Sequence, residues 1–255
     1  MRRVRFSLRV VAMALGFAVM IPLHLLWRLF GLESPWPRRA LWWVGRSAGL
    51  RVRVRGTPLR SHVLFLANHS SWLDIMAIAG ASGAAFVAKA EVRSWPVIGW
   101  LAGLNRTIYV ERSDRTAVRG QADALRTALG TGQAVALFPE GTTDGGQEIL
   151  PFRASLLASL FPPLSGIRVQ PVAIDYGAAG SDIAWTGDEP AAANVRRVLS
   201  RRGTIAVTVS FLAPIDPAAA GDRKALAAAA QAEVAAALGA SGRASAPLYG
   251  RDEDR

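Results

Sequence analysis

The stretch HVLFLANHSSWLD, residues 62–74, joins a short apolar run to a polar turn and decides how the chain folds. His62–Ala67 has the length and the Val, Leu and Phe content of a buried strand, and Ser71 is of a type that begins helices. A buried strand followed by a polar turn and a helix is the repeating unit of α/β domains, which build their sites at the carboxyl ends of strands. The stretch therefore predicts an α/β fold with candidate functional residues in Asn68–Asp74.

Six further short runs, mostly of Val, Ile, Leu and Phe, predict the other strands. These runs are residues 51–55, 84–88, 107–110, 134–138, 169–176 and 204–212. Helices are predicted at Asp114–Gly130, where apolar residues recur at helical spacing, and at Asp222–Leu238, which Gly239 ends. We expect one domain at 50–239, a mixed, mostly buried sheet flanked by helices, followed by a disordered tail at 240–255 that is rich in Ser, Gly and charge.

The first 60 residues carry the whole positive excess of the chain. They hold twelve arginines against one acid, Glu33, and the net charge of the 255 residues is +11. Among these arginines lies Val10–Trp27, eighteen residues without a formal charge. As a helix this run is about 27 Å long, slightly less than the roughly 30 Å hydrocarbon core of a bilayer. Residues 1–49 are therefore predicted to associate with a membrane.

Arginines stand on both sides of the apolar run, which removes the charge asymmetry that orients a membrane span. This arrangement favours a helix or hairpin in one leaflet with both flanks cytoplasmic, so we expect the protein at the cytoplasmic face of the inner membrane. In that position Trp27, Trp36, Trp42 and Trp43 lie at the headgroup level, and Pro22 can kink the helix. A single-pass anchor is an open alternative. A cleaved signal peptide is disfavoured, because no small-x-small site follows the run before Arg28.

Composition excludes several classes of function. A basic segment interleaved with apolar residues fits an anionic lipid surface rather than a DNA groove, so no nucleic-acid partner is expected. The chain has no cysteine, which excludes disulfides, thiolate metal sites, iron–sulfur clusters and cysteine nucleophiles. We expect neither a metal nor a cofactor.

His69 and Asp74 are the residues most able to do chemistry. If a helix begins at Ser71, Asp74 lies in its first turn and can accept the N–H of one imidazole nitrogen of His69. The other nitrogen is then a general base for a hydroxyl group. A structural alternative is a capping box in which Asp74 only accepts backbone N–H groups and His69 only ends the strand. His24 and His62 are predicted to be structural.

Two further segments carry polar groups at strand ends. In Leu137–Asp144, Glu140 can accept hydrogen bonds, Gly141 allows a close backbone approach, and Thr142 and Thr143 supply hydroxyls, although a plain Pro-Glu-Gly turn also explains this stretch. In Asn105–Arg112, two arginines bracket a short strand. A guanidinium can bind a phosphate through two hydrogen bonds, but solvated surface arginines are more common.

In this order and spacing the segments resemble the glycerolipid acyltransferase family, typified by enzymes that acylate 1-acyl-sn-glycerol 3-phosphate. Residues 68–74 resemble its N-H-x-S-x-x-D motif, and Lys89–Pro96 with Gly99 is similar to its K-x-E-x-x-x-x-P-x-x-G stretch. Tyr109–Arg112 is similar to its F-x-x-R motif and Phe138–Thr142 to its F-P-E-G-T motif. Gln170–Val172 resembles a later proline motif.

The resemblance implies a role for each candidate residue. It makes His69 the base and Asp74 the residue that orients it. Arg112, with Arg106, would bind an anionic headgroup, and Glu140, Gly141 and Thr142 would hold the polar atoms of the acceptor. Arg153, in Pro151–Leu156, would stand in for the lysine of a P-F-K-x-G stretch.

The resemblance also implies the reaction. A fatty acyl group moves from a thioester donor, acyl-CoA or acyl carrier protein, to the free hydroxyl of a lysolipid, first of all 1-acyl-sn-glycerol 3-phosphate, giving phosphatidate. Thr143 and Asp144 replace an R-S pair common in those enzymes, and the glycine after Arg153 is missing. These departures keep lyso-ornithine lipid open as the acceptor. A hydrolase is a further alternative, although the chain has no G-x-S-x-G elbow.

Overall fold

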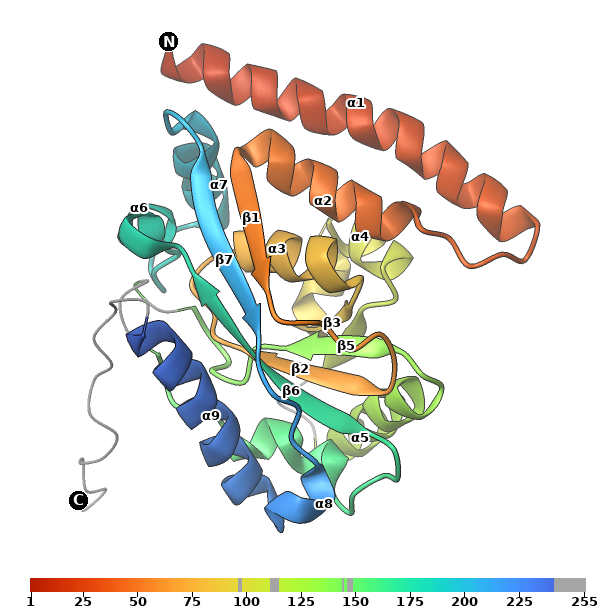
Figure 1. Cartoon of the computed structure of the whole chain (residues 1–255). Helices are drawn as coiled ribbons and strands as arrows, with labels where there is room; N and C mark the ends of the chain where they lie inside the picture. Colours follow the sequence, from red (N-terminus) through yellow and green to blue (C-terminus); the bar gives the residue numbers. More distant parts are fainter. Residues whose placement is uncertain (96–97, 111–114, 144, 146–148, 241–255) are drawn as a thin grey trace.

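The computed structural model describes residues 1–95, 98–110, 115–143, 145 and 149–240. Within these residues seven strands form one sheet in the order β1-β7-β6-β2-β5-β3-β4. The strands are β1 (Leu50–Arg55), β2 (Val63–Ala67), β3 (Ala85–Lys89), β4 (Ile108–Val110), β5 (Ala134–Leu137), β6 (Arg168–Asp175) and β7 (Ile205–Phe211). Figure 1 shows this twisted sheet with helices on both faces and one long helix across the top. The predicted mixed α/β fold is confirmed.

Helices make up most of the rest of the described chain. The α-helices are α1 (Arg2–Leu29), α2 (Trp36–Ala48), α3 (Leu73–Ser82), α4 (Ile98–Leu104), α5 (Arg115–Gly130), α6 (Gly180–Ile183), α7 (Ala191–Ser200), α8 (Pro217–Ala220) and α9 (Arg223–Gly239). The short 3₁₀ helices are η1 (Ala90–Ser94), η2 (Ala154–Leu160) and η3 (Gly177–Ala179).

Each predicted strand is present in the described chain, with its ends within one residue of the expected positions. The predicted helix starting at Asp222 is also present, because the Asp222 carboxylate accepts the N–H groups of Lys224 and Ala225 and caps α9. Gly239 is the last residue of α9 rather than the residue that ends it. Asp114, the expected cap of α5, and residues 241–255 of the expected tail lie outside the described residues.

The direction of the strands fixes where a site can form. β2 runs parallel to both β5 and β6, whereas β7 runs antiparallel to β6 and carries β1 at the sheet's edge. The carboxyl ends of β2, β5 and β6 therefore lie side by side. All five residues of β2 are buried, as expected for a central strand covered on both faces.

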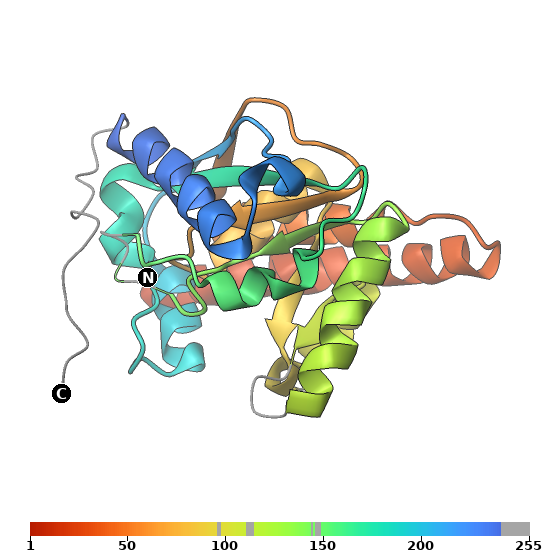
Figure 2. The ribbon, with the colours of Figure 1, turned by 90° about the horizontal axis from the view of Figure 1, so that it is seen from below.

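Alternation along the strands produces two cores, one on each face of the sheet. Val63, Phe65 and Ala67 of β2 pack with α3 and α7, whereas Leu64 and Leu66 pack with α5, η2 and α9. Figure 2 shows α9 and α5 together on the side of the sheet away from α1. Since side chains alternate between faces, position 69 continues the face that α3 covers.

The N-terminal segment forms a pair of helices against the body. α1 is a single helix that continues through Pro22, and α2 lies beneath it in Figure 1. Gly16 allows this close packing, because a Cβ there would stand 2.2 Å from Trp43 Cδ1. The indole N–H of Trp43 donates to the Ala12 carbonyl at 2.7 Å, so this tryptophan joins the two helices.

Candidate active site

The site begins where the backbone of β2 leaves the sheet. The β2–β6 ladder ends at Ala67 and Val172, and Asn68 then extends it with its side chain. The Asn68 amide donates to the Ile174 carbonyl at 3.0 Å and accepts the Ile174 N–H at 2.8 Å. The amide therefore replaces two backbone hydrogen bonds, which lets the main chain turn from β2 toward α3 while His69 stays at the sheet edge.

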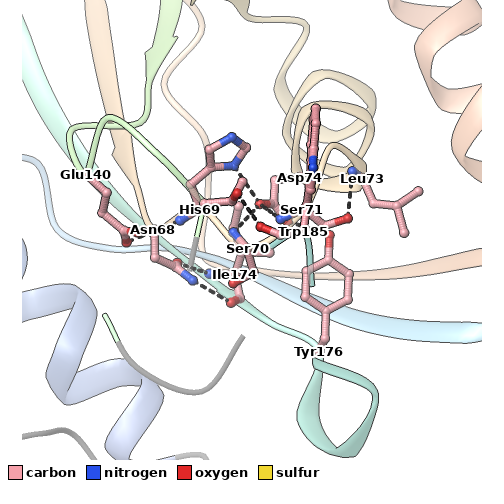
Figure 3. A network of polar contacts seen from close by, with 11 residues as sticks. Asn68, His69, Ser70, Ser71, Leu73, Asp74, Glu140, Ile174, Tyr176 and Trp185 are labelled. Atoms are coloured by element: carbon pink, nitrogen blue, oxygen red, sulfur yellow. Dashed lines mark hydrogen bonds and ion pairs between the residues drawn. The ribbon is translucent and has the colours of Figure 1, made fainter. Parts of the chain in front are cut away.

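His69 and Asp74 face each other, as the spacing predicts. Asp74 lies in the first turn of α3, is fully buried, and its Oδ2 is 2.9 Å from His69 Nδ1 (Figure 3). The His69 side chain is 18% exposed. Within the described part of the chain, the other ring nitrogen, Nε2, has no hydrogen-bond partner. A carboxylate that accepts from Nδ1 fixes the tautomer in which Nε2 is the basic nitrogen.

Asp74 also accepts backbone N–H groups, as the capping-box alternative requires. Its Oδ2 accepts the backbone N–H groups of Ser70 at 2.8 Å and of Ser71 at 2.9 Å. Ser71 is not the cap that the sequence predicts: α3 begins one residue later, after Trp72, and Ser71 Oγ only accepts the Leu73 N–H at 3.4 Å. The Asp74 carboxylate, rather than the Ser71 hydroxyl, therefore accepts the main N–H groups of this turn. One buried group therefore shapes the loop and orients the imidazole.

The turn after β5 supports His69 from the other side. The imidazole stacks on the Phe138 ring with centroids 3.9 Å apart and the planes at 12°. Glu140 is 1% exposed, and its Oε1 accepts the backbone N–H of His69 at 3.2 Å. Glu140 thus binds the main chain of the candidate base, a use that differs from the acceptor contact expected for it. Gly141 has a φ of 78°, which a residue with a side chain rarely adopts.

A segment before α7 ties the two polar loops together. The backbone N–H of Trp185 donates to the Ser70 carbonyl at 2.9 Å, and the Thr143 hydroxyl donates to the Trp185 carbonyl. The Thr143 hydroxyl therefore forms a hydrogen bond within the protein, whereas Thr142 beside it is exposed to solvent. Residue 185 therefore bonds to both loops that meet at His69.

A polar cluster on α7 anchors this segment. Arg197 binds both carboxylate oxygens of Glu189, at 2.9 and 2.7 Å, and donates to the Ala184 carbonyl at 2.7 Å. Asn194 is fully buried and accepts the indole N–H of Trp72 at 3.2 Å. The Arg197 guanidinium lowers the pKa of Glu189 to about 2. The cluster joins the turn that carries His69 to the turn that carries Trp185.

The predicted arginines do not all reach the site. Arg153 is exposed, and its backbone N–H donates to the Pro139 carbonyl at 2.9 Å, which places it beside the Phe138–Thr142 turn. Arg106 precedes β4 with a φ of 56° and lies 3.6 Å from Glu33, and its carbonyl accepts from Gln133 just before β5. The structure therefore places Arg106 near the amino ends of β4 and β5, away from His69. Arg112 lies outside the described residues.

The remaining histidines and the Lys89–Gly99 stretch have structural contacts. His24 Nδ1 is 2.8 Å from Ser34 Oγ, and His62 Nδ1 is 3.1 Å from the Leu129 carbonyl. A Cβ on Gly99 would stand 2.2 Å from the Arg93 carbonyl oxygen, so glycine is required there. Among the described residues, no three His, Asp or Glu side chains gather as a metal site would require.

The sequence reasoning missed Tyr176. This residue follows β6 directly, is 3% exposed, and donates its hydroxyl proton to Asp74 Oδ1 at 2.6 Å (Figure 3). In the sequence it is the last residue of the predicted strand 169–176, and no local signal marks it as a partner of Asp74. The pairing of β6 with β2 brings it to the carboxyl end of β2, beside Asp74.

The site thus consists of a histidine and an aspartate that meet at the carboxyl end of a strand with parallel neighbours. A family model described as Acyltransferase matches residues 51–175. The chain is 36% identical to lyso-ornithine lipid O-acyltransferase of Rhodobacter capsulatus, over 94% of this chain and 92% of that protein. It is also 36% identical to 1-acyl-sn-glycerol-3-phosphate acyltransferase of Neisseria gonorrhoeae, over 58% of this chain and 61% of that protein.

The crystal structure of the 1-acyl-sn-glycerophosphate acyltransferase PlsC from Thermotoga maritima has the same fold. Its TM-score is 0.65 at 22% identity, with 96% of this chain and 100% of that chain covered. The chain therefore belongs to the acyltransferase family, and it is an enzyme that acylates lysolipids.

Proposed function

We propose that the protein transfers a fatty acyl group from a thioester donor to the hydroxyl of lyso-ornithine lipid. The observation that carries the chemistry is the bond between Asp74 Oδ2 and His69 Nδ1, which leaves Nε2 as a base at the end of β2. In the reaction, Nε2 takes the acceptor's hydroxyl proton while the acceptor oxygen bonds to the acyl carbon. The carbon–sulfur bond then breaks, and the imidazolium returns the proton to the thiolate, which leaves as a free thiol.

Asp74 stabilises the imidazolium that forms during the transfer. A positioned general base accelerates such a reaction by about 10²- to 10⁴-fold, and holding two substrates together adds several kcal/mol. Gly141, Thr142 and Arg153 line the turn beside His69 and are proposed to hold the acceptor. Arg112 is proposed to bind an anionic group of the substrate. The donor is proposed to be acyl-CoA or acyl carrier protein.

Two observations favour lyso-ornithine lipid over 1-acyl-sn-glycerol 3-phosphate as the acceptor. The similarity to the Rhodobacter enzyme extends over 94% of this chain, but the similarity to the Neisseria enzyme over only 58%. Thr143 uses its hydroxyl to bind the Trp185 carbonyl, and it stands where lysophosphatidate enzymes commonly carry an arginine. An arginine that could bind a phosphate is thus replaced by Thr143, whose hydroxyl bonds to the Trp185 carbonyl instead. Lysophosphatidate is the second candidate.

We also propose that α1 lies flat in one leaflet, with the catalytic domain on the cytoplasmic side. α1 is the one helix of the described chain long and apolar enough to span a membrane, with a mean hydropathy of 2.1 over its best 18 residues. The N-terminal half of α1 is held against other helices, however. Arg5 and Arg9 donate to carbonyls at the end of α7, and the Ala12 carbonyl accepts the indole N–H of Trp43 in α2. These contacts keep α1 alongside α2 and α7, which supports a position in the plane of the leaflet.

The outer face of α1 supplies an apolar surface along its whole length. Exposed apolar residues recur at spacings of three, four or seven: Val4, Leu8, Val11, Leu15, Val19, Leu26 and Leu29. At 100° per residue these positions form a single stripe. A stripe of this kind, flanked by arginines, supports binding in the plane of an anionic leaflet, where the acceptor is dissolved.

A side-by-side transfer assay tests the proposed acceptor. The enzyme is supplied with acyl-CoA or acyl carrier protein as donor and with lyso-ornithine lipid or 1-acyl-sn-glycerol 3-phosphate as acceptor, and the products are identified by lipid mass. We expect ornithine lipid to form with a kcat/KM at least about tenfold above that for phosphatidate. A preference for the phosphate acceptor would exclude lyso-ornithine lipid as the main substrate.

A further inference from the structure

The carboxylate of Asp74 is held through both of its oxygens, and the two are held in different ways. Oδ2 accepts from His69 Nδ1 and from two backbone N–H groups, all within three residues of one another. Among the described residues, the donor to Oδ1 is the Tyr176 hydroxyl at 2.6 Å, from a residue 102 positions further along the chain. Three local donors thus fix one oxygen, and one distant donor fixes the other.

The bond to Oδ1 decides the plane of the carboxylate. The carboxylate plane turns about the Cβ–Cγ bond, and this rotation moves Oδ1 and Oδ2 together and changes the lone pair presented to His69 Nδ1. A contact at Oδ1, on the other side of this axis from the contacts at Oδ2, therefore restrains the rotation further. Asp74 is fully buried and Tyr176 is 3% exposed, so water does not compete for this bond. The hydrogen bond from Tyr176 also draws negative charge of the carboxylate toward Oδ1, which weakens its attraction to a protonated His69.

Other titratable groups near the pair act at different atoms. Glu140, from the turn after β5, binds the His69 backbone N–H, and Asp175 belongs to the opposite face of the sheet and accepts the Gly177 N–H at 2.8 Å. Glu189, from the turn before α7, is paired with Arg197 of α7, and α3 contributes Asp74 itself. Besides His69, Tyr176 is therefore the titratable side chain in the described chain that bonds directly to the carboxylate of Asp74.

We propose that Tyr176 is a positioning residue of the acyl transfer: its hydroxyl fixes the plane and the charge of Asp74 and thereby sets the pH at which His69 becomes an active base. This inference rests on the proposed roles of His69 and Asp74, and it assigns no contact between Tyr176 and substrate. It ties the catalytic pair to β6, so that the geometry of the pair depends on the sheet as well as on the local turn.

Tyr176→Phe removes the hydroxyl and keeps the ring. We expect kcat to fall about tenfold with KM for both substrates changed less than about twofold, because substrate contacts are untouched. The carboxylate, having lost a donor, holds an imidazolium proton more firmly. The acid limb of the kcat/KM–pH profile therefore moves to higher pH by about half a unit.

Tyr109→Phe is the matched control. Its hydroxyl also bonds to the protein, donating to the Gly99 carbonyl at 2.9 Å, but it does not contact Asp74. We expect this variant to keep the acid limb where it lies in the unmodified enzyme. A fall in kcat in Tyr176→Phe without movement of the limb, or movement to lower pH, would show a merely structural role and overturn the inference.

A second perturbation keeps the test decisive if Tyr176→Phe does not fold. The chain has three tyrosines and three histidines. In a Tyr109→Phe, Tyr249→Phe background, incorporated 3-fluorotyrosine labels position 176 alone and makes its hydroxyl a stronger donor without changing the packing. We expect the His69 imidazole resonances, followed by NMR in nanodiscs, to titrate at lower pH than with ordinary tyrosine. An unchanged titration would contradict the inference.

His69→Ala separates this inference from the proposed function. If His69→Ala retains full transfer, the proposed catalytic pair is wrong and the role of Tyr176 falls with it. If His69→Ala is inactive and neither tyrosine perturbation moves the pH dependence, only the role of Tyr176 is wrong. The NMR titration needs no acceptor, so its result is independent of which lysolipid the enzyme uses.

Discussion

The candidate active site at the end of β2 and the N-terminal pair of helices, α1 and α2, place their polar and apolar groups in opposite ways. At the edge of β2, a fully buried carboxylate accepts four hydrogen bonds and an imidazole is the group left partly open. On α1, polar contacts lie toward the protein and apolar side chains such as Leu8 and Leu15 face outward. The difference teaches that, under the proposed function, the chemistry would depend on buried polar bonds and the location of the enzyme on exposed apolar surface. The two can therefore be changed separately.

The largest effect is expected from Asp74→Asn. The new amide brings two donors to a position surrounded by donors, so the Ser70–Ser71 turn and the His69 tautomer are both disturbed. We expect kcat for acyl transfer to fall about 10²- to 10⁴-fold, while sedimentation with anionic vesicles is unchanged. A variant with more than about a tenth of the original kcat would show that Asp74 is not needed to orient the base.

A smaller effect, on membrane binding rather than on catalysis, is expected from the double variant Leu15→Asp with Val19→Asp. Both side chains lie on the exposed stripe of α1, and burying a carboxylate in the interface is unfavourable. We expect vesicle binding to weaken on the order of 10²-fold, with kcat in mixed micelles retained. Vesicle sedimentation and a micelle assay measure the two quantities.

Ala228→Asp with Ala229→Asp is the control for this pair. It adds the same charge to exposed positions of α9, on the face of the sheet away from α1. We expect nearly unchanged vesicle binding. If the α9 variant loses binding as strongly as the α1 variant, net charge rather than the α1 stripe holds the enzyme to the membrane.

The smallest effect is expected from Glu189→Gln, which weakens the cluster that joins the two loops. The Arg197 guanidinium lowers the pKa of Glu189 to about 2, from 4.5. A lowered pKa contributes stability that is fully present above pH 4.5 and is lost as the pH falls toward 2. We expect a free energy of unfolding about 1 kcal/mol lower than that of the unmodified protein at pH 6, because the pair is partly exposed.

Urea unfolding at several pH values measures this difference. The gap between Glu189→Gln and the unmodified protein should shrink steadily between pH 5 and pH 3. A gap that stays constant over this range would mean that the variant acts through packing rather than through the charge of Glu189.

The sequence predicted the elements and the contact between His69 and Asp74 because their signals are local. Apolar runs locate the strands, and five positions of separation suffice to bring His69 to Asp74. Tyr176 could not be predicted, since its contact with Asp74 depends on β6 lying beside β2, and single runs do not encode the order of strands. The same limit applies to Asn68, whose partner Ile174 lies on β6.

Arg106 and Glu140 show the limit of inference from motifs. Arg106 was expected to bind the headgroup with Arg112 because the two arginines bracket a short strand, but it precedes β4 and lies 3.6 Å from Glu33. Glu140 was expected to bind an alcohol, which stays a prediction, and the structure adds that its Oε1 accepts the His69 backbone N–H. Residue type predicted the ability to form a polar contact in each case, and the strand end or the burial decided the partner.

The most direct test is thiol release from the acyl donor by the unmodified enzyme and by His69→Ala, with and without lyso-ornithine lipid. Thiol reagents give no background from the protein, which has no cysteine. We expect release by the unmodified enzyme only when the lysolipid is present, and a loss of about 10²- to 10⁴-fold in His69→Ala with an unchanged circular dichroism spectrum. Release without lysolipid, or full release by His69→Ala, would contradict base-catalysed acyl transfer at this residue.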